Sequence, residues 1–518
     1  MGVDNETRAS HAAPSTLRKR AGFYTGIAAS GLILILPAPD GMTPEARRMA
    51  ATVVLMGCWW IGESLPLGVT ALVPLVAFPM LKILPIAQIA PTYTNHFVFL
   101  LLGGFFIALA MQRWNLHTRI ALWIIRLVGT SATRLVLGFM LASAFLSMWI
   151  SNSATAMMMM PICLGLIVKT EELQGGSASP SVANFGACLM LGIAYASNIG
   201  GVATLVGTFP NLVFAGMFQE LFPGGPDITF VEWLKIGLPF SAMFVPLIWL
   251  FMVKVMLPIK GNVVENADQV ITTEFERLGP FSRGEKMILA VFIATALLWI
   301  FRSDVHFGGA VLRGWASRLG VEKYVHDSTV AIGMGILCFI LPVDRKRNIQ
   351  LLEWDQALKA PWGILLLFGG GFAIARGFEA SGLTQWVGTQ LTVLEGVPVI
   401  IVIAAVVFTM TFLTEMTSNT ASTTMMLPIL AATATVLRIN PLLLMLPATM
   451  AASCAFMLPI ATPPNAIVFS SGRVNLAQMG KTGFFLNLIT VVFVTCFVYF
   501  VVTRILGIST DQPPAWMN

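Results

Sequence analysis

The stretch that decides the fold reads Trp-Ile-Ser-Asn-Ser-Ala-Thr at residues 149–155 and is followed by Pro161. It places hydroxyl and amide side chains inside an otherwise apolar run. A similar order, Thr-Ser-Asn-Thr-Ala-Ser-Thr, returns at residues 417–423 and is followed by Pro428. The two copies keep one spacing, because 418 − 151 and 428 − 161 both equal 267. A motif that keeps its distance to a downstream proline in both copies indicates a duplicated element.

The composition indicates a polytopic membrane protein. The 518 residues are 56% hydrophobic and only 11% charged, whereas about 25% charged residues is typical of a soluble domain. Apolar segments such as 287–301 and 486–502 approach the roughly 20 residues that a helix needs to cross the hydrocarbon core. The alternation expected of a membrane barrel is absent, so the spans are predicted to be helices. The six cysteines lie in apolar surroundings without a CxxC pair, which is typical of buried small side chains.

The hydropathy pattern predicts an all-α protein with about eleven transmembrane helices and two re-entrant hairpins. The predicted order is a cytoplasmic tail at 1–20, a first transmembrane helix at 21–47, a first repeat at 48–257, a cytoplasmic connector at 258–284, a second repeat at 285–508 and a C-terminal tail at 509–518. Within the first repeat we expect a hairpin at 134–168 and a broken helix at 185–222. Within the second repeat we expect a hairpin at 398–436 and a broken helix at 441–472.

The distribution of charge predicts the orientation in the membrane. The net charge of +6 is dispersed, and four arginines occur between residues 113 and 134 with no acidic residue among them. Three acidic residues lie between 219 and 232, in a loop predicted on the other side. The positive-inside rule therefore places the N-terminus in the cytoplasm and the C-terminus outside the cytoplasmic membrane. Because an odd number of crossings separates the two copies, the halves are predicted to be an inverted repeat.

The two polar motifs predict a binding site. Polar groups and broken backbone in the hydrocarbon core are tolerated only where they line a cavity or are buried in protein. A hairpin tip exposes a helix N-terminus suited to an anion, and its carbonyl, hydroxyl and amide oxygens suit a hard cation such as sodium. Each hairpin also has a proline-containing loop as a partner, GVATLVGTFPN at 201–211 and FMLPIATPPN at 456–465. These loops align at a constant spacing, since 461 − 207 and 465 − 211 both equal 254.

Single polar residues allow other interpretations. One Ser-Asn-Ser motif alone is also compatible with packing between membrane helices. Glu415, three residues before Ser418, is a candidate proton carrier, but the first hairpin has Met148 at the matching position, which favours a structural role. Glu63 falls near a predicted span end, where contact with the interface is a sufficient explanation.

Four motifs in order resemble the signatures of the divalent anion:sodium symporter family, which includes the INDY-type dicarboxylate and citrate transporters. They are SNSATAMMMMPI at 151–162, GTFPN at 207–211, TEMTSNTASTTMMLPI at 414–429 and ATPPNAIVF at 461–469. The resemblance extends from about residue 48 to the end of the chain. It implies a homodimer in which a transport domain moves as an elevator against a fixed scaffold.

The resemblance also implies the residues of the site. One sodium ion would be held by Ser147, Ser151, Asn152 and the carbonyl of Gly207, and a second by Thr414, Thr417, Ser418, Asn419 and the carbonyl of Ala461. The substrate carboxylates would lie among Ser151, Asn152, Ser153, Thr208, Ser418, Asn419, Thr420 and Thr462, with Pro463 shaping the loop. Two departures from the family pattern, Ser153 for the usual threonine and Phe209 for a frequent proline, bear on the identity of the substrate.

Together these observations predict sodium-coupled uptake of a C4-dicarboxylate such as succinate, malate or fumarate. Dicarboxylate exchange, proton-coupled transport, and transport of citrate or sulfate on the same fold are the alternatives. The expected partners are the dicarboxylate anion, sodium ions and the lipid bilayer, and no nucleic acid. An enzyme is disfavoured because the five histidines are scattered without an HExxH motif, and a channel because no helix has a continuous polar face.

Overall fold

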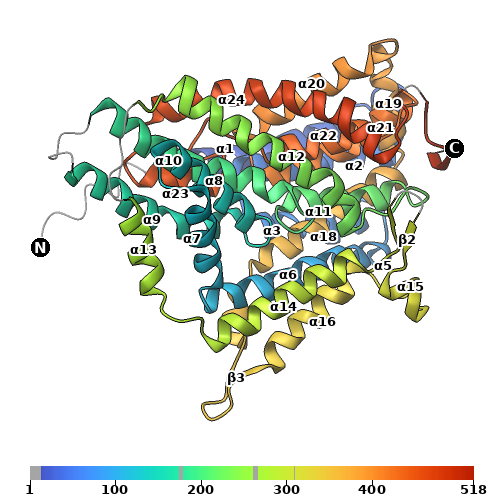
Figure 1. Ribbon diagram of the computed structural model, residues 1–518. Helices are drawn as coiled ribbons and strands as arrows, with labels where there is room; N and C mark the ends of the chain where they lie inside the picture. The colour runs from blue at the N-terminus through green and yellow to red at the C-terminus, as the bar shows by residue number, and fades with distance from the viewer. Residues whose placement is uncertain (1–12, 174–178, 261–266, 308–309, 511, 518) are drawn as a thin grey trace, which may run out of the picture.

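The computed structural model describes residues 13–173, 179–260, 267–307, 310–510 and 512–517. The described chain is almost entirely helical, and its strands form only two short hairpins, β1 (Val305–Phe307) with β2 (Ala310–Leu312) and β3 (Pro342–Asp344) with β4 (Ile349–Gln350). This confirms the predicted all-α class. Many of the longer helices, such as α12 and α24, run across the molecule in Figure 1, whereas α7 and α13 run steeply across that direction.

The first part of the chain forms helices that support the site. Helix α1 (Ala13–Ile35) packs along α2 (Pro44–Gly62), and the short helices α3 (Leu67–Thr70), α4 (Val73–Met80), α5 (Ile86–Ile89) and η1 (Ala90–Thr94) lead into α6 (His96–Arg113). Thr43 caps α2, because its side chain accepts a hydrogen bond from the Ala46 N–H. The middle of the chain contains six further helices, which are α13 (Ala267–Arg277), α14 (Arg283–Ile300), α15 (Trp315–Leu319), α16 (Asp327–Ile340), α17 (Trp354–Ala357) and α18 (Trp362–Ala380).

The two repeated regions have matching helix boundaries. Helices α8 (Ala132–Ser147) and α20 (Val399–Thr414) both begin and end 267 residues apart, since 399 − 132 and 414 − 147 give this value. Helices α9 (Asn152–Leu173) and α21 (Asn419–Val436) also begin 267 residues apart, as do α7 (Leu116–Val128) and α19 (Leu383–Gln390). The duplication seen in the sequence is therefore a duplication of secondary structure.

A broken helix follows each hairpin. In the first half α10 (Pro180–Val202) and α11 (Phe209–Leu221) are separated by a loop, and α12 (Phe230–Phe251) continues into the π-helical segment η2 (Met252–Met256). In the second half α22 (Leu442–Ala452) and α23 (Pro463–Ser470) are separated in the same way. The last helices are α24 (Leu476–Cys496), the π-helical segment η4 (Phe497–Val502) and α25 (Thr503–Leu506), and short 3-10 turns occur at η3 (Thr392–Leu394) and η5 (Ala515–Met517).

Helix α10 lies at the centre of the protein. From Phe185 to Val202 every residue of this helix is buried, and it packs against α8, α9, α12 and α23. The Trp233 indole N–H donates to the Val202 carbonyl over 2.8 Å, and the Tyr195 hydroxyl donates to the Phe456 carbonyl over the same distance. The first bond joins α12 to the end of α10, and the second holds the loop of the second helix break against α10.

Six helical segments among the described residues are long and apolar enough to cross a membrane by length and composition. They are Ile86–Arg113, Asn152–Glu172, Pro180–Val202, Phe230–Met256, Trp362–Ala380 and Leu476–Leu506. Five shorter apolar helices accompany them, at Leu67–Met80, Ala132–Ser147, Asp327–Ile340, Val399–Thr414 and Leu442–Ala452. These segments fit a multi-pass membrane protein, while the number of about eleven crossings stays a prediction.

Two boundaries differ from the sequence-based expectation. Helix α1 begins at Ala13, so the last part of the predicted tail at 1–20 is helical, because Leu17, Arg18 and their neighbours continue the first helix instead of forming a separate coil. The predicted connector at 258–284 contains α13, an amphipathic helix that packs on α7 and α9. In Figure 1, α13 lies at one end of the helix bundle, whereas β2 and α15 lie at the opposite end.

Candidate functional site

The tip of the first hairpin is the break between α8 and α9. Helix α8 ends at Ser147 and α9 begins at Asn152, and the Ser147 hydroxyl donates to Asn152 Oδ1 over 2.5 Å across this break. The Ala154 N–H donates to Ser151 Oγ over 3.3 Å, which caps the new helix. The Ser151 hydroxyl therefore satisfies one backbone N–H freed by the break, while the bond between Ser147 and Asn152 joins the two helix ends.

The tip of the second hairpin repeats this arrangement. Helix α20 ends at Thr414 and α21 begins at Asn419, and the Thr414 hydroxyl lies 2.6 Å from Asn419 Oδ1. The same hydroxyl lies 2.9 Å from the Ala452 carbonyl of α22, and the Thr417 hydroxyl contacts that of Ser422. Each tip thus has one hydroxyl and one asparagine oxygen in contact at the same place in the repeat.

The loops that break the neighbouring helices also share one local structure. Thr208 and Thr462 precede α11 and α23 with φ/ψ of −140°/147° and −140°/150°. The Asn211 amide nitrogen lies 2.7 Å from the Thr204 carbonyl, and the Asn465 amide nitrogen lies 3.1 Å from the carbonyls of Ala455 and Leu458. Each asparagine therefore closes its own loop by binding carbonyls that no helix satisfies.

Two glycines let oxygen atoms gather beside the first tip. A Cβ at Gly201 would lie 2.8 Å from Asn152 Oδ1 and 3.1 Å from the Gly207 carbonyl oxygen. A Cβ at Gly207 would lie 2.5 Å from the Gly201 carbonyl oxygen and 2.9 Å from that of Ser147. These oxygens are uncharged and close together, which is the donor set that a hard monovalent cation requires. Among the described residues no three or more His, Cys, Asp or Glu side chains cluster as metal ligands.

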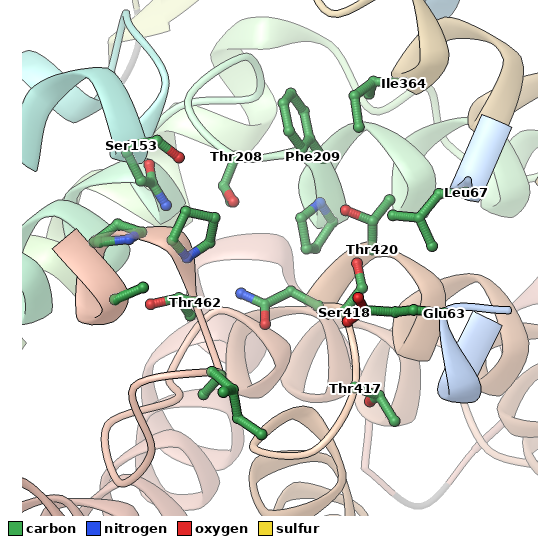
Figure 2. A pocket seen from close by; sticks show the side chains of 18 of the residues that line it. Glu63, Leu67, Ser153, Thr208, Phe209, Ile364, Thr417, Ser418, Thr420 and Thr462 are labelled. Carbon is green, nitrogen blue, oxygen red and sulfur yellow. The ribbon is translucent and has the colours of Figure 1, made fainter. Parts of the chain in front are cut away.

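Both tips and both loops line one cavity of about 600 Å³ (Figure 2). All nine residues predicted to bind substrate lie on its wall, namely Ser151, Asn152, Ser153, Thr208, Ser418, Asn419, Thr420, Thr462 and Pro463. Of the residues predicted to bind cations, Gly207, Thr417 and Ala461 also line it, whereas Ser147 and Thr414 are fully buried behind the tips. The structure therefore brings together residues that are more than 250 positions apart in the chain.

Four helix N-termini meet at this cavity. Helices α9, α11, α21 and α23 begin at Asn152, Phe209, Asn419 and Pro463, and all four residues line the cavity. The free N–H groups and the positive end of the helix dipole at each N-terminus favour an anion. Pro463 at the start of α23 loses no hydrogen bond, because the N–H at this position has no partner within the helix.

Lys19 and Glu63 are the only charged residues among the described residues that line the cavity. Glu63 follows α2 with a left-handed backbone, φ 50°, and in Figure 2 it lies with Leu67 beside Ser418 and Thr420. The sequence-based view of Glu63 as a residue at a span end missed this contact with the cavity. Glu63 directly follows a helix, at a position where glycine is the commonest residue. A charged residue at this position is the signal that could have singled out Glu63 in the sequence.

Asn198 is a further residue that sequence reasoning missed. It is fully buried in α10, its Oδ1 lies 3.4 Å from Asn152 Nδ2, and its Nδ2 donates to Thr462 Oγ1 over 3.1 Å. It therefore joins the first tip to the loop of the second repeat. An asparagine within an apolar, fully buried helix was the available signal.

Glu415 anchors the second loop. Its carboxylate accepts hydrogen bonds from the backbone N–H groups of Phe456, Met457 and Leu458 over 2.6, 2.9 and 3.0 Å. The Asn487 amide donates to the same carboxylate over 2.8 Å. The carboxylate thus satisfies the unwound backbone before α23, and these contacts fit the structural role favoured above.

A helical membrane protein with paired hairpins and paired helix breaks around one polar cavity belongs to the class of secondary transporters. Residues 18–506 match the family model described as the sodium:sulfate symporter transmembrane region. The chain is therefore a member of this family, in agreement with the resemblance drawn from its motifs. Its relatives are transporters and not enzymes, as the sequence predicted.

Curated relatives are similar over almost the whole chain. The sodium-dependent dicarboxylate transporter SdcS of Staphylococcus saprophyticus is 41% identical over 485 residues, which cover 93% of this chain and 91% of the relative. SdcS of Staphylococcus aureus strain RF122 is 40% identical over 499 residues, covering 95% and 94%.

Two solved structures share the fold. MtrF of Neisseria gonorrhoeae, described as belonging to a class of antimetabolite efflux pumps, has a TM-score of 0.56 at 12% identity and covers 92% of this chain and 98% of its own. The YdaH transporter of Alcanivorax borkumensis has a TM-score of 0.55 at 13% identity and covers 80% and 88%. At this identity the similarity concerns the fold alone.

Proposed function

We propose that this protein couples sodium influx to the uptake of C4-dicarboxylates such as succinate, malate and fumarate across the cytoplasmic membrane. The observation that carries the proposal is the meeting of four helix N-termini and two oxygen-rich tips at one cavity. Relatives at 40–41% identity that are named sodium-dependent dicarboxylate transporters support both the ion and the substrate class.

Each tip would bind one sodium ion. The first site comprises Ser147, Ser151, Asn152 and the Gly207 carbonyl, and the second comprises Thr414, Thr417, Ser418, Asn419 and the Ala461 carbonyl. Since these groups are uncharged, bound sodium supplies positive charge next to the anion. If the anion binds well only beside bound sodium, each ligand raises the affinity for the other by the same factor, and this linkage couples the two fluxes.

The substrate would lie between the tips. One carboxylate would face Asn152, Ser153 and Thr208, and the other would face Asn419, Thr420 and Thr462, so that each half of the repeat holds one end of the molecule. The volume of about 600 Å³ suits a small dicarboxylate with its ions. Sulfate is the second candidate, because the description of the family names it.

The architecture proposed with this function is an inverted repeat whose hairpins move together as an elevator. We assign residues 48–257 and 285–508 to the two repeats, with the N-terminus in the cytoplasm and the C-terminus outside. The working unit would be a homodimer, in which the two scaffolds hold each other fixed while each transport domain moves.

The test is uptake of labelled succinate into proteoliposomes under an inward sodium gradient. We expect uptake to fall at least tenfold when choline replaces sodium, because the helix N-termini alone would not neutralise two carboxylates. Unlabelled malate and fumarate should compete, and sulfate and citrate should compete weakly. Uptake that is equal in choline and sodium would refute the coupling, and competition by sulfate alone would favour the second candidate.

A further inference from the structure

Arg18 joins the first helix to the tip of the second hairpin. It lies in the second turn of α1, and its guanidinium donates to the Ile61 carbonyl from Nε over 3.2 Å and from Nη2 over 2.6 Å. The same Nη2 donates to the Met416 carbonyl over 2.7 Å. One side chain therefore bridges the end of α2 and the tip of the hairpin formed by α20 and α21.

The two carbonyls have a reason to bind a cation. Ile61 belongs to the last turn of α2, and Met416 follows the C-terminus of α20. Carbonyls at a helix C-terminus have no partner within the helix and lie at the negative end of its dipole. A guanidinium presents several donors in a fixed plane, so that it can bind two such carbonyls at once.

The Arg18 bridge, meaning its hydrogen bonds to the Ile61 and Met416 carbonyls, is present at only one of the two tips among the described residues. The position that matches Met416 in the first hairpin is Trp149, since 416 − 149 equals 267. Trp149 packs its ring against Phe292 at 4.7 Å between ring centroids and against Phe230 at 6.0 Å. At this position the first tip thus packs an aromatic ring against its neighbours, while the second tip is held by a charged hydrogen bond.

Residues next to the bridge line the cavity. Lys19 follows Arg18, and Glu63 and Ser64 follow Ile61, and all three lie on the cavity wall with Met416. Met416 is 67% exposed, so apolar burial does not hold this part of the tip in place. The bridge therefore links the second tip to α2 beside the cavity, near the start of α1.

We propose that Arg18 is a positioning residue that holds the second hairpin tip against α2 and so stabilises the conformation in which the cavity opens toward the start of α1. This inference rests on the proposed transport function, because a transporter must expose its cavity to each side in turn. Movement of the tip away from α2 breaks the bond between Arg18 and Met416. Loss of that bond shifts the population toward the conformation that opens to the opposite side.

The test measures from which side of the membrane the cavity can be labelled. Ile460, in the loop between α22 and α23, lines the cavity and is 69% exposed, so an Ile460→Cys variant reports access to it. A charged, membrane-impermeant maleimide is applied to right-side-out and to inside-out vesicles. The chain without this substitution measures the labelling of its own cysteines, of which Cys496 is exposed.

With Arg18 present we expect labelling mainly from the side on which α1 begins. The ratio is the labelling from the side on which α1 begins divided by the labelling from the opposite side. Adding Arg18→Ala should lower this ratio at least threefold. Arg20→Ala is the matched control, because it removes the same charge from an exposed position on the same helix and should leave the ratio unchanged. An equal ratio in the Arg18→Ala and Arg20→Ala variants would overturn the proposal.

A conservative variant covers the case in which Arg18→Ala does not yield a monodisperse protein. Arg18→Lys keeps the charge but lacks the planar set of donors, so it should shift the ratio in the same direction. An unchanged ratio in folded Arg18→Lys would then refute the proposal. The labelling uses neither sodium nor dicarboxylate. A negative labelling result would therefore refute the role of Arg18 alone, whereas a negative uptake result would refute the proposed substrate or ion.

Discussion

At the residue scale, Gly201 and Gly207 decide whether oxygen atoms can approach one another beside the first tip. A Cβ added at either position would lie within 3 Å of an oxygen, a distance that folded proteins essentially never show. The sequence marks these glycines as part of a loop. Their role in the packing of Asn152 and the Ser147 carbonyl depends on contacts between different helices.

We predict that Gly201→Ala abolishes sodium-dependent uptake. The new methyl group would lie 2.8 Å from Asn152 Oδ1 and 3.1 Å from the Gly207 carbonyl oxygen, so the Asn152 side chain would have to move and the cluster of oxygens would open. Gly165→Ala in α9 is the matched control, because a Cβ there meets nothing within 4 Å. Alanine is favoured over glycine in a helix by about 1 kcal/mol, so this control should keep its uptake. Sodium-dependent uptake by Gly201→Ala at the level of Gly165→Ala would contradict the proposed ion site.

At the scale of elements, the two hairpins are equivalent parts of one site. Their helix boundaries, their contacts between hydroxyl and asparagine, and the loops that face them all repeat. Since each tip provides one helix N-terminus and one oxygen cluster, neither hairpin alone surrounds an anion with two charged ends. Transport should therefore need both tips.

We predict that Asn152→Ala and Asn419→Ala each reduce uptake to background while the protein stays folded. Each change removes an oxygen that binds a hydroxyl across a helix break and faces the cavity. Asn184→Ala provides a matched control, because Asn184 binds the Pro258 carbonyl and neither residue lines the cavity. Gel filtration and uptake are measured on all three variants. Normal uptake by Asn152→Ala or by Asn419→Ala would exclude a site built from paired tips.

At the scale of the whole molecule, contacts between the two repeats hold the cavity together. Asn198 of the first repeat binds Thr462 of the second, and Tyr195 binds the Phe456 carbonyl. Arg473 and Glu171 form an ion pair with 2.5 Å between Nη1 and Oε1, joining the end of α9 to the residues after α23. A ligand in the cavity therefore touches both repeats and stabilises their association.

We predict that sodium raises the thermal unfolding midpoint of the purified protein and that succinate raises it further only when sodium is present. A ligand that binds only the folded state at one hundred times its dissociation constant adds about 2.7 kcal/mol to the free energy of unfolding. The midpoint is measured in sodium and in choline at equal ionic strength. Gly201→Ala should show a smaller shift with sodium than the unchanged protein. Equal midpoints in sodium and choline would argue against bound sodium.

The sequence by itself determined the class of protein, the helix breaks and the duplication. These features are local, because apolar length, prolines and polar interruptions act on the segment that contains them. For this reason the predicted hairpins at 134–168 and 398–436 lie close to the observed ones, at 132–173 and 399–436. The nine predicted substrate residues follow from the resemblance of the motifs to those of a known family, and all nine line one cavity.

Only the tertiary structure decided which other residues reach that cavity. Asn198 meets a residue 264 positions away, and Arg18 meets one 398 positions away. Such contacts depend on how whole helices pack, and no periodicity or spacing within one segment encodes them. The contacts of the first turns of α1 are of the same kind, because they join Arg18 to α2 and the second tip and place Lys19 on the cavity wall. The pairing of distant helices thus turns two polar motifs into one site.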